Sequence, residues 1–184
     1  KKDVLKSIQK RKINFSIIKN YHKCIAKKCF ENKIVGFSNG KLEFGDRALG
    51  SRSIFGNPTN KKTKDLINIS IKYREKYRPF APSIIEDHFE KYFETDGCKN
   101  NNYMERVFKI KKNYIDKLPG IVHLDNTARV QTVNRTTNPD FYKILKEFEK
   151  ISGFPILLNT SFNINGEPIV CSPDDAINTF FKSG

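Results

Sequence analysis

Hydrophobic and polar positions along the first half of the chain predict helices and short strands in turn. Residues 17–30 place apolar side chains near helical spacing, and residues 34–40 form an apolar run that ends in a turn. Asn60 is a suitable N-cap for a helix that continues to about residue 73. Two prolines hold residues 78–85 extended, because the residue before a proline avoids the helical region.

The second half of the chain predicts more strands and two well-marked helices. A short helix is expected over residues 86–93, followed by a polar surface loop over 95–102. Apolar residues 155–162 predict a buried strand that ends in polar side chains. Three more strands are expected over 104–110, 120–125 and 128–133, and two helices opened by proline over 139–152 and 173–181. The pattern predicts a mixed α/β class and a single domain over residues 1–184.

Length and composition agree with one soluble globular domain. The chain has 184 residues, 38% of them hydrophobic, which is enough to build a core. No apolar run approaches the roughly 20 residues of a membrane span, so we expect a cytoplasmic protein without membrane contact. The four cysteines include no CxxC pair, so we expect free thiols and no metal site.

Four clusters of polar residues are candidates for a ligand site. Residues 43–58 contain several glycines and a proline, are too broken for a long element, and predict a binding loop with Arg47 and Arg52. Arginine presents a planar fork of donors that matches phosphate oxygens, so several arginines in one cleft would hold a polyanion. The other candidates are Lys72, Arg74 and Arg78, then Arg129, and finally Thr160, Ser161 and Asn163 after the apolar run.

Charge alone does not choose the ligand. The formal net charge of +14 favours nucleotide phosphates, nucleic acid or an acidic partner, and the scattered lysines are typical of a solvated surface. A single arginine is more often a surface ion-pair partner than a ligand. The arginine neighbours here are glycine, alanine, proline and phenylalanine, which indicates buried surroundings. His123 and Asp125 leave two interpretations open, an acid–base or metal pair and a structural pair.

These segments, in this order, resemble the C-terminal domain of the O-carbamoyltransferase family that includes nodulation-factor and antibiotic carbamoyltransferases. The similarity runs from about Ile34 to the end of the chain. The sequence GKLEFGDRALGSRSI at residues 40–54 carries the most specific match. The other matching segments are residues 72–75, 78–83, 123–133, 158–163 and 166–170.

The resemblance implies a YrdC-like fold, related to threonylcarbamoyl-adenylate synthases, with a twisted mixed β-sheet and flanking helices around a basic concave cleft. In that fold a Lys-x-Arg and a Ser-x-Asn pair line the site. They match Lys72 with Arg74 and Ser161 with Asn163. The resemblance also implies that the domain takes carbamoyl phosphate and ATP, with Mg²⁺, and forms carbamoyl-adenylate. A partner N-terminal domain would then transfer the carbamoyl group to an acceptor hydroxyl.

The expected roles follow from that resemblance. Catalytic roles are expected for Lys72, Arg74, Arg78, Arg129 and Ser161. Binding of ATP and carbamoyl phosphate is expected from Arg47, Arg52, Lys72, Arg74, Arg78, Arg129, Thr160, Ser161 and Asn163.

The sequence also departs from the family pattern. Asp46 replaces a usual proline, Ser51 an asparagine and Asn126 a glycine. Asp46 could neutralise Arg47 or point into solvent. The chain starts without Met and lacks the family's long N-terminal domain, so we expect a fragment that does not complete the transfer alone.

Two other functions compete with this one. A stand-alone tRNA-binding or threonylcarbamoyl-adenylate synthase-like module would fit the positive charge, but the sequence contains no RNA-recognition motif, so nucleic acid is not the expected partner. A non-catalytic scaffold would follow if Asp46 disabled the binding loop.

Overall fold

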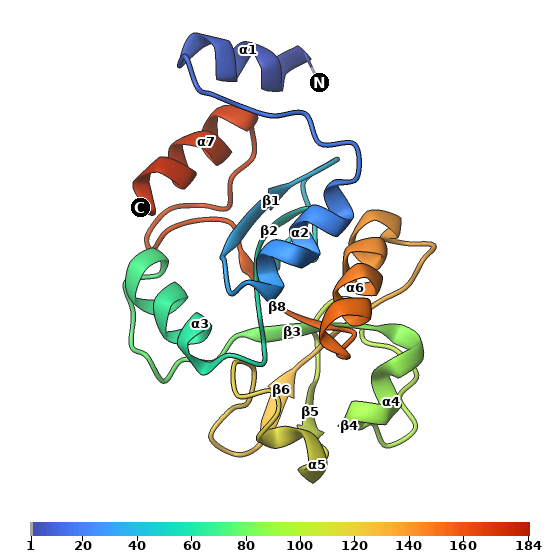
Figure 1. Ribbon diagram of the computed structural model, residues 1–184. Coiled ribbons are helices and arrows are strands. Elements are labelled where there is room, and N and C mark those ends of the chain that lie inside the picture. The colour runs from blue at the N-terminus through green and yellow to red at the C-terminus, as the bar shows by residue number, and fades with distance from the viewer. Residues whose placement is uncertain (1) are drawn as a thin grey trace.

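The fold is built on two β-sheets with helices around them (Figure 1). The computed structural model describes residues 2–184, in which the larger sheet has five strands and the smaller has three. The larger sheet has the order β1 (Val35–Ser38), β2 (Arg52–Gly56), β8 (Ile156–Ser161), β3 (Ala81–Ile85) and β7 (Gln131–Val133). Only β3 and β7 of this sheet pair in parallel, so the sheet is mixed. The smaller sheet is β4 (Phe93–Glu94), β5 (Val107–Ile110) and β6 (Thr127–Arg129).

The helices begin where local capping signals place them. Asn60, Asn138 and Ser172 each accept a backbone N–H through the side chain, which confirms the expected starts. The helices are α1 (Lys2–Lys10), α2 (Tyr21–Phe30), α3 (Lys61–Leu66), α4 (Phe89–Tyr92), α5 (Lys112–Ile115), α6 (Pro139–Ser152) and α7 (Pro173–Lys182). A π-helical turn, η1 (Ile67–Ile71), extends α3, and a 3-10 turn, η2 (Glu86–His88), precedes α4.

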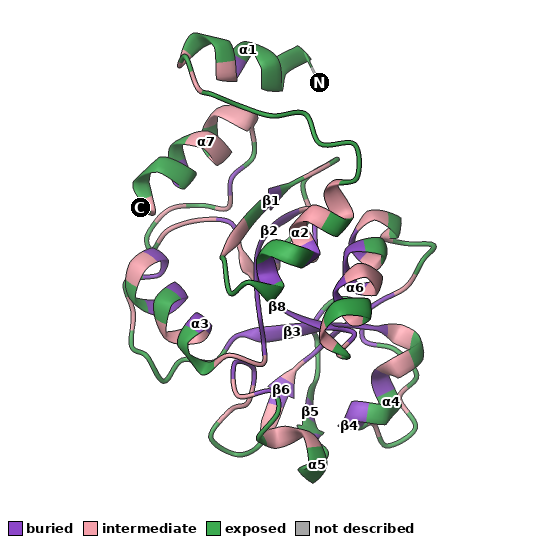
Figure 2. Ribbon diagram, in the orientation of Figure 1, coloured by how far each residue is buried: buried purple, intermediate pink, exposed green. Residues whose placement is uncertain are grey.

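The larger sheet separates two hydrophobic clusters. Along β8, Leu157 packs with Phe148 of α6 and Cys29 of α2, whereas Ile156 and Leu158 pack in the cluster on the other face. Successive side chains of a strand point to opposite faces, so a central strand that is apolar throughout must be covered twice. Helices α2 and α6 lie side by side over one face, and the strands between the layers are largely buried (Figure 2). The mixed α/β class is therefore confirmed.

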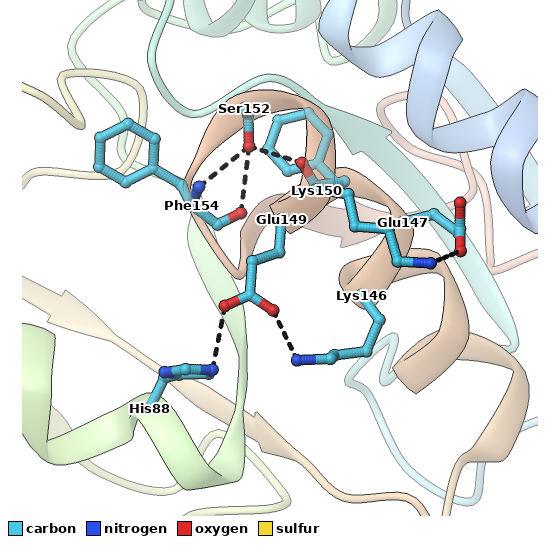
Figure 3. Close-up of polar contacts among 8 residues, drawn as sticks. His88, Lys146, Glu147, Glu149, Lys150, Ser152 and Phe154 are labelled. Atoms are coloured by element: carbon cyan, nitrogen blue, oxygen red, sulfur yellow. Dashed lines mark hydrogen bonds and ion pairs between the residues drawn. The ribbon is translucent and has the colours of Figure 1, made fainter.

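The C-terminal end of α6 is fastened to the segment below it (Figure 3). Glu149 accepts a hydrogen bond from Lys146 at 2.7 Å and faces His88 of η2 at 3.0 Å. The Ser152 hydroxyl donates to the Phe148 carbonyl at 2.7 Å and accepts from the backbone N–H of Phe154. These contacts fix the entry into β8, the strand that ends at the candidate site.

Four sequence expectations about secondary structure are corrected. The strand expected over 128–133 is divided into β6 of the smaller sheet and β7 of the larger sheet. Residues 120–125 do not form a strand but turns, with the Gly120 N–H donating to the Pro58 carbonyl at 2.8 Å. The segment 43–58 is not a loop throughout, because buried β2 occupies its second half. The first predicted helix begins at Tyr21 rather than at residue 17, since the Asn20 side chain caps it there.

The sequence also led us to expect free cysteine thiols and no membrane-spanning segment. Cys24, Cys29, Cys98 and Cys171 are free thiols, and burial raises the pKa of Cys29 to about 12. Among the helices of residues 2–184, none is long and apolar enough to cross a membrane.

Candidate functional site

A pocket of about 150 Å³ lies where the loop before β2, the segment before β3 and the end of β8 meet. Hydrogen-bonded pairing of β2 and β3 on either side of β8 brings these distant segments together. The structure thereby gathers five of the predicted binding residues around one space. The polar side chains in its wall include Asp46, Arg47, Arg74, Arg129, Thr160 and Ser161.

Lys72 lies directly beside this wall and is almost fully buried, with 5% of its surface exposed. Its Nζ donates to the backbone carbonyls of Ser161 at 2.7 Å and Asn163 at 2.9 Å. The Asn163 Oδ1 and the Ser161 Oγ accept at 2.7 and 3.2 Å. Burial, and next the charge of Arg74, lower the pKa of Lys72 to about 7. The predicted Lys-x-Arg and Ser-x-Asn residues therefore meet, and Lys72 uses its donors on the chain itself.

Arg74 is placed on the pocket wall by a buried neighbour. Its Nε donates to the Oδ1 of Asn68 at 2.8 Å, and its guanidinium carbon lies 4.6 Å from the ring centroid of Phe80. The intervening Tyr73 has φ 42°, in the left-handed region that side chains rarely adopt. This backbone reversal lets Lys72 turn toward the end of β8 while Arg74 reaches the pocket. Strain of this kind is maintained only where the surroundings fix it.

Arg47 and Arg129 contribute the other two positive charges. Arg47 is half-exposed and lies 3.4 Å from Asp46, whose side chain is 80% exposed. An ion pair this open to solvent is weak, so Asp46 does not cancel Arg47. Burial, and next the charge of Arg47, lower the pKa of Arg129, while Asp46 opposes this. The Nε of Arg129 is buried without a hydrogen-bond partner among the described residues.

Asn159 is a wall residue to which the sequence analysis assigned no role. It is 1% exposed, and its Nδ2 donates to the Ala48 carbonyl at 3.0 Å, Ser83 Oγ at 3.0 Å and Gln131 Oε1 at 3.2 Å. Gln131 Nε2 in turn donates to the Leu49 carbonyl at 2.8 Å. The side-chain amides of Asn159 and Gln131 therefore hold the backbone of Ala48 and Leu49, directly after Arg47, against the larger sheet. Asn159 stands inside the matched segment LNTSFN, which was the available signal for it.

Arg52 is not brought into the pocket. It is 7% exposed, and its two terminal nitrogens donate to four backbone carbonyls at 3.0 to 3.2 Å. Those carbonyls belong to Asn39, Gly40, Ser51 and Cys171. With these donors occupied, Arg52 clamps the chain around β1 and β2 and has little left for a ligand.

The remaining candidates also lie outside the pocket wall. Arg78 is half-exposed and pairs with Glu75 at 3.0 Å, in the geometry of a surface ion pair. His123 Nδ1 lies 3.1 Å from the hydroxyl of Thr127, and Asp125 accepts from the same hydroxyl at 2.7 Å. Asp125 also accepts the Thr127 backbone N–H at 3.2 Å. Here the contacts favour the structural interpretation of the pair, which closes the turn before β6.

No preformed metal cage is present in residues 2–184, where no group of three or more His, Cys, Asp or Glu side chains could hold an ion. Asp46 is the carboxylate in the pocket wall. Mg²⁺ usually keeps several waters and binds through one or two carboxylates together with substrate phosphates. The wall offers one carboxylate, Asp46, to such an ion.

Fold and pocket together describe an α/β domain with three arginines at the end of a mixed sheet. The family model described as the carbamoyltransferase C-terminus matches residues 26–184, so the chain belongs to the carbamoyltransferase C-terminal family. Nodulation protein NolO of Bradyrhizobium diazoefficiens is 47% identical over 151 residues, covering 82% of this chain and 28% of that protein. Nodulation protein U of Rhizobium fredii is 42% identical over 135 residues, covering 73% and 23%. The chain thus spans less than a third of the length of either relative.

One solved structure supports the architecture. The crystal structure of full-length HypF in the phosphate- and nucleotide-bound form has a TM-score of 0.67 and 21% sequence identity. The similarity covers 94% of this chain and 21% of HypF. At this level of identity the likeness concerns the fold, and it agrees with the mixed sheet and flanking helices described above.

Proposed function

We propose that this domain binds carbamoyl phosphate and ATP in the arginine-lined pocket and forms carbamoyl-adenylate. The carbamoyl group then passes to an acceptor hydroxyl in another domain of a longer O-carbamoyltransferase. The observation that carries the proposal is the convergence of Arg47, Arg74 and Arg129 on one pocket beside Ser161. Family membership supports the transferase class, and HypF, which shares the fold, was crystallised with phosphate and nucleotide bound.

The proposed chemistry has two balanced steps. Water cleaves carbamoyl phosphate to carbamate and phosphate, and a carbamate oxygen then attacks the α-phosphorus of ATP. The bond between the α-phosphorus and its bridging oxygen breaks, and pyrophosphate leaves with the electron pair. Two polyanions must approach each other, so the three arginines offset their repulsion and stabilise charge at the phosphoryl oxygens.

Neutral groups and one carboxylate complete the site. Thr160 is held by the rigid end of β8 and supplies a hydroxyl to orient phosphate oxygens. The Ser161 hydroxyl donates to Asn163 Oδ1 at 2.6 Å and would contact a ligand only by releasing that bond. Lys72 positions Ser161 and Asn163 through its hydrogen bonds. Mg²⁺, entering with ATP and contacting Asp46, would neutralise part of the polyphosphate charge. The resemblance implies a YrdC-like fold, and we expect the same set of residues to line the ligand site in that fold.

Calorimetric titration with ATP and Mg²⁺ tests the proposal. The intact chain should bind one nucleotide, and Arg47→Ala or Arg129→Ala should weaken binding roughly 10- to 100-fold. The reason is that each charge-assisted hydrogen bond contributes about 1.5–3 kcal/mol. Arg135→Ala, which removes an exposed arginine before α6, is the matched control and should bind like the unaltered chain.

The competing function predicts a different result. A nucleic-acid module would show no saturable ATP binding and would bind RNA with an affinity that falls steeply as salt rises. A non-catalytic scaffold would bind neither ligand. Either result, or equal weakening by Arg135→Ala, would reject the carbamoyl-adenylate proposal.

A further inference from the structure

The carboxylate of Glu43 closes the base of the loop that carries Arg47. Its Oε1 accepts the backbone N–H groups of Leu49 at 2.9 Å, Ser51 at 2.6 Å and Arg52 at 3.2 Å. Its other oxygen, Oε2, is buried and has no hydrogen-bond partner among the described residues. The carboxylate is therefore enclosed by the loop, and these three N–H groups take the place of water around a charge that would otherwise be costly to bury.

The loop depends on side-chain acceptors because its backbone is not paired in a sheet before β2 begins. Gly45 and Gly50 have φ 119° and 108°, in the left-handed region that glycine favours, so the chain turns before and after the segment 46–49. The Gly50 N–H donates to Ser53 Oγ at 3.1 Å. Side chains thus hold four consecutive N–H groups, those of residues 49–52, as the chain enters β2.

Arg47 has little support of its own in this loop. Within the described part of the chain, the polar contact of its guanidinium is the solvent-open ion pair with Asp46. Its place in the pocket wall is therefore set by the backbone that carries it. Asn159 and Gln131 hold the carbonyls of the two residues that follow Arg47, and Glu43 holds the N–H groups beyond them.

We propose that Glu43 is a positioning residue for the anion pocket, which keeps the loop closed and Arg47 in the wall before a ligand arrives. The inference rests on the proposed function, and it assigns Glu43 a role that acts through Arg47 rather than by contact with the ligand. A donor that is already in place contributes its full hydrogen bond. A donor on a loose loop must first be ordered, and that cost is subtracted from the affinity.

The sign of the effect separates positioning from simple charge. A carboxylate repels a nearby polyphosphate, so charge alone predicts that Glu43→Ala binds ATP more tightly. Positioning predicts that this variant binds ATP roughly 10-fold more weakly. Glu105→Ala is the matched control, because it removes an exposed carboxylate beside Met104 of the pocket wall and should leave ATP affinity unchanged or slightly higher.

Calorimetric titration with ATP and Mg²⁺ measures the coupling between Glu43 and Arg47. Arg47→Ala should weaken binding roughly 10- to 100-fold in the unaltered chain but no more than about threefold in Glu43→Ala, because a loose loop contributes little. Arg129→Ala should cost the same in both backgrounds, since Arg129 is carried by β6 and not by the loop. A general loss of folded protein would not single out Arg47 in this way.

Glu43→Gln provides a second test if Glu43→Ala does not fold. The amide keeps an acceptor oxygen at the same reach without the charge, so its hydrogen bonds are weaker. ATP affinity should fall roughly two- to fivefold, and this loss should disappear when Arg47→Ala is also present. Hydrogen exchange followed by NMR should show faster exchange of the Leu49 and Ser51 amides in either variant, with Leu158 in β8 unchanged.

Equal losses on Arg47→Ala with and without the Glu43 carboxylate would overturn the inference. Unchanged or tighter ATP binding by Glu43→Ala would also overturn it, as would unchanged exchange of the Leu49 and Ser51 amides. The proposed function would still stand in those cases, because ATP binding by the unaltered chain tests it directly. Absence of ATP binding by the unaltered chain would instead reject the proposed function together with the inference.

Discussion

Replacing Arg52 by leucine is expected to lower the free energy of unfolding by about 3–5 kcal/mol. Arg52 is 7% exposed, and its guanidinium donates to carbonyls on two other segments of the chain, residues 39–40 and Cys171. Leucine fills part of the volume but leaves those carbonyls without donors, and a buried polar group without a partner is costly. Urea unfolding and thermal melting measure the loss, which corresponds to a drop in the melting temperature of roughly 10 °C.

Arg47→Ala is the matched control for the loss of stability expected in Arg52→Leu. Arg47 is half-exposed and its ion pair with Asp46 is open to solvent, so its removal should change stability by no more than about 0.5 kcal/mol. Its effect should fall on ATP affinity instead. Unchanged stability of Arg52→Leu together with lost ATP binding would contradict the clamp and return Arg52 to the set of ligand contacts.

The different roles of Arg47 and Arg52 show where sequence reasoning ends. Both lie in one glycine-containing segment, and both match the family pattern, so the residues themselves do not distinguish a ligand contact from a clamp. The distinction depends on the carbonyls of Gly40, twelve residues before Arg52, and of Cys171, 119 residues after it, which the fold brings to the same guanidinium. Such long-range partners are not visible in a local pattern.

Local signals were more reliable. The helix starts after Asn60, Asn138 and Ser172 were predictable because a capping side chain satisfies backbone N–H groups only a few residues away. The strand expected over 120–125 was wrong, although its alternation was typical of a strand. A strand needs a neighbour, and the backbone of this segment is taken up by turns and by Pro58 instead.

In the candidate site, too, the sequence predicted which residues take part but not how the fold orients them. Lys72, Arg74, Ser161 and Asn163 were matched through the resemblance, and the structure places them together. Which of them face the pocket depends on the reversed backbone at Tyr73 and on the order of strands around β8, and neither follows from the motifs. The assignment of these residues to ATP and carbamoyl phosphate stays a prediction until binding is measured.

The pH dependence of stability tests the burial of Lys72. Its pKa is about 7 in the folded chain and near 10.5 when unfolded, so between these values the unfolded state binds more protons. The free energy of unfolding should therefore rise with pH from about 7. The gain up to pH 9 is about 2–3 kcal/mol, because one pKa unit corresponds to about 1.36 kcal/mol.

The thiol of Cys29 sets the upper end of the pH range in which the free energy of unfolding should rise. Burial raises the pKa of its thiol from 9.0 to about 12, so above pH 9 the unfolded thiol loses its proton first and stability falls. At pH 9 half of the unfolded thiols are ionised, so between pH 7 and pH 9 Cys29 subtracts only about 0.4 kcal/mol from the rise due to Lys72. Lys72→Met removes the titrating amine and should abolish the rise, whereas Lys109→Met, at an exposed position of β5, should leave it intact.

Urea unfolding at the two pH values decides the outcome. A flat profile in the unaltered chain would mean that Lys72 stays protonated, with its four oxygen acceptors outweighing burial and the charge of Arg74. A rise that persists in Lys72→Met would assign the titration to another group. A rise that depends on Lys72 would establish that the amine behind the arginine pocket changes charge near neutral pH. Filling the pocket with a polyanion should then draw a proton onto Lys72, which couples the charge of the site to its ligand.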